Sequence, residues 1–350
     1  MKIKIKDRYV GDNCKPYIIA EIGANHNGDM NLCKKLIYEA KKAGADAVKF
    51  QLFSVDTVFS NKVYEDNYFI ADDYRKRKDY TLKQIVKKYS ISINELKMVQ
   101  SYCKKLRIHF GITPFSFKEM KKIKNNLKPD FIKIASMDCN NYEFVKFVGK
   151  SSKKVILSTG LSDLSEINKS VRAFEDSGNK NLIILHCIAE YPPADNKTNL
   201  RNILTFKKLF PYPIGFSDHS KGIGIALGSI ALGACAVEKH FTVDKKMEGW
   251  DHHMSLDEVE LKELAKESQR VFKALGSSSI KRVESNKRIE SFRRSIVAKI
   301  DIKKNHIIKR GMLELKRPGT GLSPENIKFI IGKKAKKNIY KDKIITTKDF

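Results

Sequence analysis

The stretch YIIAEIGANHNGDMNLCKKLIYEAKKAGADAVKFQLF, residues 17–53, reads as a strand, a helix and a second strand. Its ends, YIIAEIG and ADAVKFQLF, are short apolar runs, a pattern typical of strands buried on both faces. Apolar residues between them recur at helical spacing and form one stripe. The residues of this stripe are Leu32, Leu36, Ile37, Ala40 and Ala43. With Asp29 as N-cap and Gly44 as C-terminal stop, the pattern predicts a parallel strand–helix–strand unit.

Six further apolar runs follow along the chain, separated by segments of helical character. They are RIHFGITPF (107–115), FIKIASMD (131–138), KVILSTG (154–160), LIILHCIAEYP (182–192), YPIGFSD (212–218) and ACAVEKHF (234–241). Eight strand–helix units predict an α/β fold, a (β/α)8 TIM barrel. A doubly wound open sheet is the alternative, but no G-x-G-x-x-G sequence follows the first run to support its dinucleotide-binding form.

The barrel pattern fades near Leu275, and the rest of the chain has a different character. The segment GSSSIKRVESNKRIE, residues 276–290, is polar and begins with small residues, which is typical of a linker. Residues 291–350 alternate in short segments separated by turn signals such as RPGTG, residues 317–321. We therefore predict a barrel domain over residues 1–275, a linker over 276–290 and a small β-rich domain over 291–350.

The composition is that of a globular protein with a basic surface. Of the 350 residues, 41% are hydrophobic, and the formal net charge is +28. Residues 281–350 hold 21 Lys and Arg against 7 Asp and Glu, half of the excess. Such charge attracts nucleic acids, membrane surfaces or phosphorylated substrates. Because no basic stretch with interleaved aromatic residues is present, we favour lysines spread over solvated helix faces and expect no nucleic-acid partner.

The cysteines and the hydropathy pattern indicate the compartment. The six cysteines form no C-x-x-C pair and no Cys/His zinc spacing, which argues against a disulfide framework or a structural zinc site. No charged-then-apolar leader and no long apolar span occur, so we expect no secretion signal and no membrane partner. A reducing, cytoplasmic location fits this pattern best.

Two lysines lie inside otherwise apolar strands, near the carboxyl ends where barrel active sites form. They are Lys49 in AVKFQ and Lys133 in FIKIAS. A buried lysine needs an anionic partner. We favour a phosphate or carboxylate of a substrate, with hydrogen bonds from hydroxyl groups at neighbouring strand ends. The hydroxyl residues are Ser136, Ser158 and Thr159. The alternative is a structural ion pair, for instance between Lys49 and Glu21.

Two histidines follow the seventh and eighth runs, His219 in GFSDHS and His240 in VEKHF. Barrel closure places these runs side by side, so both imidazoles are expected to reach one divalent ion, such as manganese. The acidic residues Asp218, Glu238 and Asp251 lie near them in the sequence. Structural histidines are the alternative for either residue alone.

Nine motifs stand in the order found in the sialic acid synthase (N-acetylneuraminate synthase) family, which this sequence resembles from Ile18 to Phe350. The motifs are IIAEIGANHNGD, ADAVKFQ, TPF, KIAS, ILSTG, LHC…EYP, GFSDHS, EKHFT and RPGTG. Many separated motifs agree in order and spacing, so the resemblance is specific. The tail is similar to the C-terminal antifreeze-like (SAF) domain of that family.

The resemblance implies condensation of phosphoenolpyruvate with an N-acylated amino-sugar aldehyde, giving a nine-carbon keto sugar acid and phosphate. It implies that His219 and His240 bind a divalent metal, Mn²⁺ with Mg²⁺ or Co²⁺ as alternatives, and that Glu21 handles a proton. It implies that phosphoenolpyruvate is bound by Lys49, Thr113, Lys133, Ser136 and Ser158. It places Gln51 near the metal or its waters, and Phe115, Asp138, Tyr191 and Asp251 at the sugar. Arg317 would reach the sugar site of a partner subunit, which implies a domain-swapped homodimer.

Two departures from the family pattern leave the identity of the acceptor sugar undecided. Asp138 stands where the family often has glutamate, and Ala189 replaces a polar residue of some members. Legionaminic and pseudaminic acid synthases, which perform the same chemistry, are therefore alternatives to a synthase that uses N-acetylmannosamine. A metal-dependent lyase or isomerase on the same barrel is a second class. A polyanion-binding protein on an inactive barrel is a third, and the polar residues at the strand ends argue against it.

Overall fold

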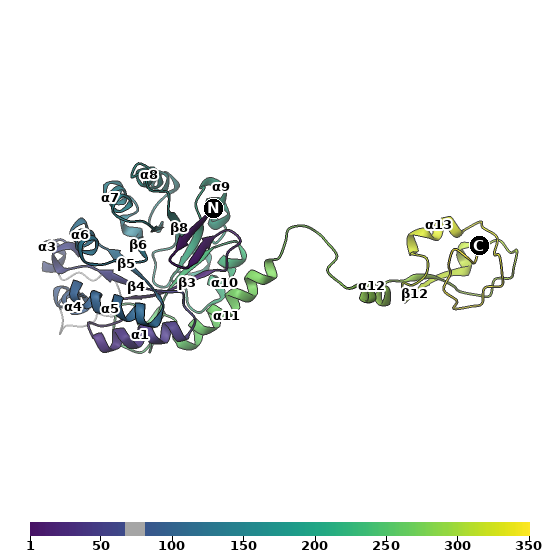
Figure 1. Ribbon diagram of the computed structural model, residues 1–350, viewed down its shortest axis with the longest axis horizontal. Coiled ribbons are helices and arrows are strands. Elements are labelled where there is room, and N and C mark those ends of the chain that lie inside the picture. Colours follow the sequence, from purple (N-terminus) through teal and green to yellow (C-terminus); the bar gives the residue numbers. More distant parts are fainter. Residues whose placement is uncertain (67–80) are drawn as a thin grey trace. The chain divides into compact units, whose positions relative to one another are not determined.

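The computed structural model describes residues 1–66 and 81–350, which form two units, Met1–Gly276 and Ser277–Phe350. The first unit is a closed barrel of eight parallel strands with helices around it (Figure 1). The strands are β3 (Tyr17–Gly23), β4 (Ala47–Leu52), β5 (His109–Pro114), β6 (Phe131–Ile134), β7 (Val155–Ser158), β8 (Leu182–Cys187), β9 (Ile214–Asp218) and β10 (Ala236–His240). Because β10 pairs with both β9 and β3, the predicted TIM barrel is confirmed and the open sheet is excluded.

Helices follow the strands along the chain, and the first helix shows how the sequence sets where a helix begins and ends. They are α1 (Met30–Lys42), α2 (Val55–Val58), α3 (Asn61–Glu65), α4 (Leu82–Tyr89), α5 (Ile93–Leu106), α6 (Phe117–Asn126), α7 (Tyr142–Ser151), α8 (Leu164–Glu175), α9 (Asn202–Leu209), α10 (Gly224–Ala231) and α11 (Glu258–Leu275). Asp29 caps α1 by accepting a hydrogen bond from the backbone N–H of Asn31, and Gly44 follows with φ +94°, which suits glycine. No helix in the described part of the chain is both long and apolar enough to cross a membrane.

A hairpin that the sequence analysis did not predict closes the amino-terminal end of the barrel. It consists of β1 (Lys2–Ile5) and β2 (Arg8–Gly11), and its residues Ile3, Ile5 and Val10 are buried in one cluster with Tyr17 at the start of β3. A larger cluster lies between the strands and the surrounding helices. The hairpin therefore covers the amino-terminal end with a mainly apolar cluster, and the polar residues that line the cavity lie at the other end.

The second unit has its own small core. It contains α12 (Asn286–Phe292), the antiparallel strands β11 (Ser295–Ala298) and β12 (Leu313–Lys316), and α13 (Ile327–Ile330), with isolated bridges between its other segments. Buried isoleucines dominate its interior. Residues 276–285 are exposed and have no helix or strand, whereas the last part of the predicted linker forms the first residues of α12.

Candidate active site

The carboxyl ends of the barrel strands enclose a cavity of about 720 Å³. All eight strands contribute side chains to its lining. These are Glu21, Lys49, Gln51, Thr113, Lys133, Ser158, Cys187, Ser217, Glu238 and His240. Residues two apart on one strand, such as Glu238 and His240, share this face because side chains alternate along a strand. The barrel therefore directs one set of polar groups into one enclosed space.

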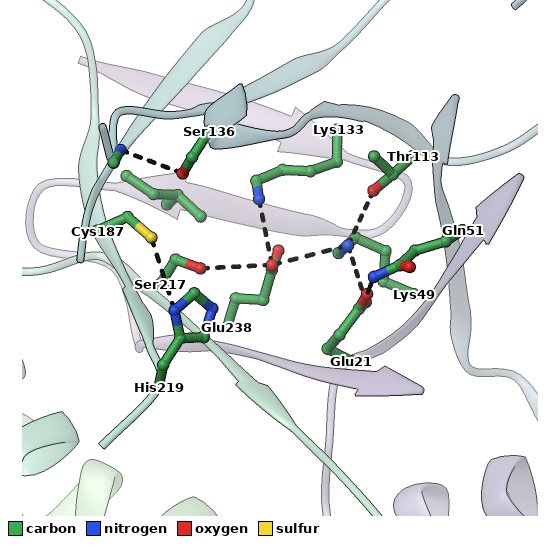
Figure 2. A network of polar contacts seen from close by, with 12 residues as sticks. Glu21, Lys49, Gln51, Thr113, Lys133, Ser136, Cys187, Ser217, His219 and Glu238 are labelled. Atoms are coloured by element: carbon green, nitrogen blue, oxygen red, sulfur yellow. Dashed lines mark hydrogen bonds and ion pairs between the residues drawn. The ribbon is translucent and has the colours of Figure 1, made fainter. Parts of the chain in front are cut away.

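The two predicted lysines meet carboxylates in the middle of this cavity (Figure 2). Nζ of Lys49 lies 2.8 Å from Oε2 of Glu21 and donates to Oγ1 of Thr113 at 2.8 Å. Nζ of Lys133 lies 3.1 Å from Oε1 of Glu238, and the same oxygen is 3.7 Å from Nζ of Lys49. Both lysines thus open into one site, and the alternative pairing of Lys49 with Glu21 is also present.

The surroundings of Glu21 and Glu238 shift the pKa values of these two carboxylates in opposite directions. Burial raises the pKa of Glu21, and the nearby Lys49 opposes this only in part, so its pKa stays above the ordinary value. Burial also acts on Glu238, but Lys133 and Lys49 outweigh it and hold the pKa of Glu238 below its ordinary value. Glu238 is consequently the fixed negative charge between the lysines, and Glu21 is the carboxylate better suited to exchange a proton.

The two predicted histidines lie side by side at the rim of the lysine–carboxylate network. The ring centroids of His219 and His240 are 5.5 Å apart, and Tyr191 stacks on His219 at 4.0 Å. Nδ1 of His219 is 2.8 Å from the carbonyl oxygen of Ile188, which accepts its proton and leaves Nε2 as the free lone pair. Oδ2 of Asp251 lies 3.4 Å from Nδ1 of His240.

This pair fits one divalent ion. Neutral imidazole is the form that binds metal, and burial lowers the pKa of His240 well below its ordinary value. Burial acts in the same direction on His219, but the adjacent Cys187 outweighs it and raises the pKa of His219. A ring spacing of 5.5 Å lets one ion contact a nitrogen of each. Within residues 1–66 and 81–350, no cluster of three or more His, Cys, Asp or Glu side chains is arranged for a metal. Water or substrate oxygens would complete the coordination, as in open catalytic sites.

Comparison with known proteins agrees with this geometry. The NeuB family model matches residues 36–280, and the SAF domain model matches residues 293–350. The chain belongs to the NeuB family.

Several relatives of this NeuB-family chain are named synthases. It is 40% identical to N,N'-diacetyllegionaminic acid synthase of Campylobacter jejuni over 334 residues, 95% of this chain and 99% of that one. It is 33% identical to human N-acetylneuraminate-9-phosphate synthase, covering 97% of this chain and 93% of that one. The crystal structure of N-acetylneuraminic acid synthetase from Leptospira borgpetersenii matches with a TM-score of 0.73 and 33% identity, covering 82% and 94%. The predicted resemblance is confirmed: the chain is a synthase of a sialic-acid-type nonulosonate.

Most of the other predicted site residues of this NeuB-family enzyme line the same cavity. They are Phe115, Ser136, Tyr191 and Asp251. Ser136 Oγ accepts a hydrogen bond from the backbone N–H of Gly160 at 3.1 Å, whereas the buried Oγ of Ser158 has no partner in the described part of the chain. Gln51 donates to Oε1 of Glu21 at 2.8 Å and so fixes the orientation of that carboxylate.

Three predicted residues lie outside this constellation. The hydroxyl of Thr159, expected to bind the substrate, instead donates to the carbonyl oxygen of Leu185 at 3.0 Å and does not line the cavity. Asp138 ends the short turn that begins with Ser136 but does not itself line the cavity. Burial raises its pKa to about 6, and its buried Oδ2 has no hydrogen-bond partner among the described residues. Arg317 belongs to the second unit, where its guanidinium lies 5.0 Å from the ring centroid of Phe292.

Of the lining residues that lie on the barrel strands, three were not assigned a site role by the sequence analysis: Glu238, Ser217 and Cys187. Glu238 was placed only near the histidines, yet it is the partner of both lysines. Ser217 Oγ donates to Glu238 at 3.5 Å, and the Cys187 thiol lies 4.0 Å from Nδ1 of His219. The period of two along a strand, counted back from each histidine, identifies Glu238 and Ser217 as residues of the inner face.

Proposed function

We propose that this NeuB-family synthase condenses phosphoenolpyruvate with an N-acylated amino-sugar aldehyde and releases phosphate, with the help of a divalent ion. Mn²⁺ is the expected ion, with Mg²⁺ or Co²⁺ as alternatives. The observation that carries the proposal is the convergence of Lys49 and Lys133 with His219 and His240 on one cavity. A triply charged enol phosphate requires cationic groups that bind it. The carbonyl compound with which it condenses requires polarisation of its carbonyl group.

The lysine side of the cavity supports the binding of phosphoenolpyruvate. The side-chain nitrogens of Lys49 and Lys133 each lie against a carboxylate, at 2.8 Å from Glu21 and 3.1 Å from Glu238, and both side chains line the cavity. The unpartnered hydroxyl of Ser158 supplies a donor that a phosphate or carboxylate oxygen would satisfy. Thr113 and Ser136 complete the set that would surround this substrate.

The histidine side supports binding of the aldehyde. His219 and His240 would hold the ion, which polarises the aldehyde carbonyl when bound. Carbon 3 of the enolpyruvyl group forms a bond to the aldehyde carbon, whose oxygen takes up a proton. Water adds to carbon 2, and Glu21, whose pKa is raised, accepts the proton that this water loses. The bond from carbon 2 to the phosphate oxygen then breaks as the new hydroxyl loses its proton, which leaves a keto group and inorganic phosphate. The two protons of the water thus end on the former aldehyde oxygen and on the phosphate.

The acceptor is expected to be an N-acylated amino sugar. The relatives are named for the synthesis of N,N'-diacetyllegionaminic acid and N-acetylneuraminate-9-phosphate, both of which carry acylated nitrogen. In this chain, Phe115, Tyr191 and Asp251 line the cavity and would contact the sugar. N-acetylmannosamine and its di-N-acetylated analogues are the acceptors to compare.

We further propose a domain-swapped homodimer in the cytoplasm. In such a dimer, Arg317 of the SAF domain would contact the sugar bound in the barrel of the partner subunit. The exposed segment of residues 276–285, which has no helix or strand, supplies a connection that such an exchange requires.

Phosphate release from phosphoenolpyruvate tests the proposed reaction. The assay compares N-acetylmannosamine and its di-N-acetylated analogues, each with Mn²⁺ and with a chelator. We expect phosphate and a keto sugar acid in equal amounts, with at least one acceptor and only when the metal is present. Phosphate release without acceptor, or full turnover in the chelator, would overturn the proposal.

A further inference from the structure

The loop between β10 and α11, residues 241–257, carries three cavity residues, Trp250, Asp251 and His253. Its two ends are tied together, because the N–H of Thr242 donates to the carbonyl oxygen of Leu256 at 2.9 Å. Between these ends the only regular element is a single 3₁₀ turn, His252–Met254. The position of the cavity residues therefore depends on the contacts that the loop makes with the rest of the barrel.

The motif NHNG, residues 25–28, supplies these contacts from the loop that follows β3. The buried side chain of Asn25 donates to the carbonyl oxygen of Phe241 and to Oγ of Ser255, both at 2.9 Å. Ser255 Oγ in turn donates to the carbonyl oxygen of Asp251 at 2.6 Å. One amide side chain thus connects the base of the loop to the backbone of a residue that lines the cavity.

Asn27 holds the far side of the same loop. Its Nδ2 donates to the carbonyl oxygen of Glu248 at 2.8 Å, which leaves Oδ1 to accept from Nε2 of His252 at 3.3 Å. Nδ1 of His252 then accepts from the hydroxyl of Thr242, 2.6 Å away. Burial lowers the pKa of His252 to about 4, so the imidazole stays neutral and keeps this arrangement at neutral pH.

The packing at this point leaves no space for a side chain at Gly249. A Cβ atom at Gly249, the residue before Trp250, would lie 2.3 Å from the ring of His252 and 3.0 Å from Oδ1 of Asn27. On its other side Trp250 contacts Tyr89, with ring centroids 5.3 Å apart. Hydrogen bonds and close packing together fix the backbone that carries Trp250 and Asp251.

We propose that Asn25, Asn27 and His252 are positioning residues that hold the 241–257 loop in the conformation required to bind the amino-sugar acceptor. This inference rests on the proposed function, in which the loop faces the sugar. Lys49 and Lys133 lie on strands and do not depend on the loop. Loosening the loop should therefore weaken binding of the acceptor and leave that of phosphoenolpyruvate unchanged.

Asn27→Gly is the most informative variant. Asn27 has φ +51°, a left-handed conformation that glycine adopts without strain, so the substitution removes the two side-chain contacts and leaves the backbone free of strain. Asn27→Asp keeps an acceptor for His252 but places a carboxylate against the carbonyl of Glu248. Asn31→Ala, at an exposed position in the first turn of α1, is the control.

Initial rates are measured with whichever of N-acetylmannosamine and its di-N-acetylated analogue the wild type uses faster. We expect KM for the acceptor to rise about tenfold in Asn27→Gly and in Asn27→Asp, corresponding to roughly one lost hydrogen bond. KM for phosphoenolpyruvate should stay within about twofold, and Asn31→Ala should match the wild type. An unchanged acceptor KM, or an equal rise of both KM values, would overturn the inference.

Hydrogen exchange tests the anchoring without any substrate. Backbone amides of residues 241–257 should exchange faster in Asn27→Gly than in the wild type, whereas those of the barrel strands and the Asn31→Ala control should not change. Unchanged exchange in the loop would refute the positioning role. A wild type that turns over neither sugar would instead refute the proposed function, so the two failures are distinguishable.

Discussion

Glu238 on β10 contacts Lys133 on β6 across the inside of the barrel, with 3.1 Å between Oε1 and Nζ. The two strands stand opposite each other in the ring of eight. The same oxygen lies 3.7 Å from Lys49, so one carboxylate balances two ammonium groups in the space proposed for phosphoenolpyruvate. In the free protein both lysines are therefore held in place by carboxylates of the barrel itself.

This arrangement predicts the effect of Glu238→Gln. Removing one partner of a buried ion pair leaves an uncompensated charge, so the free energy of unfolding should fall by about 3 kcal/mol. Saturating phosphoenolpyruvate should raise the melting temperature of the variant more than that of the wild type, because its negative charge replaces the lost carboxylate. Chemical denaturation and thermal unfolding measure the two effects.

Glu190→Gln is the matched control for this substitution. Glu190 pairs with Lys197 at 2.9 Å, but their side chains are 48% and 58% exposed, so its loss should cost about 0–1 kcal/mol. Equal destabilisation by the two substitutions would show that Glu238 does not balance the lysines.

His240→Ala should weaken Mn²⁺ binding strongly in the absence of any substrate. The imidazoles of His219 and His240 are the proposed protein ligands of the ion, and the substitution removes one of them. Calorimetric titration of the unliganded protein with Mn²⁺ measures the loss directly. His306→Ala, at an exposed position of the second unit, is the control and should bind as the wild type does. Wild-type Mn²⁺ affinity in His240→Ala would remove this residue from the metal site.

The raised pKa of Asp138 predicts that the stability of the fold depends on pH. Its folded pKa of about 6 exceeds the ordinary value of 3.8, so the folded state binds the proton more tightly than the unfolded state does. The contribution of this carboxyl group to the free energy of unfolding is therefore fully present below about pH 4. It is lost as the pH rises through about 6, and the loss amounts to up to about 3 kcal/mol. Asp138→Asn should therefore be more stable than the wild type at pH 7 and equal to it at pH 3.5.

Denaturant titrations at both pH values measure this difference, with Asp56→Asn as the control because the Asp56 side chain is 76% exposed. A stability difference for Asp138→Asn that is the same at pH 3.5 and pH 7 would contradict a raised pKa.

Subunit mixing tests the proposed domain swap. Arg317→Ala and His240→Ala should each be nearly inactive alone. In a swapped heterodimer, the barrel that retains His240 receives the SAF domain that retains Arg317, so mixing should restore activity at one site of two. Phosphate release by the mixture, after unfolding and refolding together, is the measurement. No recovery in a mixture that forms heterodimers would indicate that each Arg317 serves its own barrel.

The repeating part of the fold was predictable because it is encoded locally. The apolar run at Tyr17, the cap at Asp29 and the stop at Gly44 lie within one short stretch, and each reappears in the structure with its expected function. The convergence of Lys49, Lys133 and the two histidines followed from a general rule, that barrel strands present polar residues at their carboxyl ends.

Most of the pairings between side chains inside the site could not be predicted from the sequence. Glu238 and Lys133 are 105 residues apart, and no local pattern shows which inward-facing groups meet across a closed barrel. The same holds for Asn27 and Glu248, which are 221 residues apart. The hairpin that closes the amino-terminal end is short, and its role depends on the barrel that it covers.

The central claim is that the histidine pair and the lysine pair act on one ion and one enol phosphate in the same cavity. A crystal structure of the protein with Mn²⁺ and phosphoenolpyruvate, recorded at the manganese absorption edge, tests it most directly. The account predicts an anomalous peak about 2.2 Å from a nitrogen of both His219 and His240, with the phosphoenolpyruvate oxygens on Lys49 and Lys133. A peak away from both imidazoles, or phosphoenolpyruvate bound outside the cavity, would contradict it.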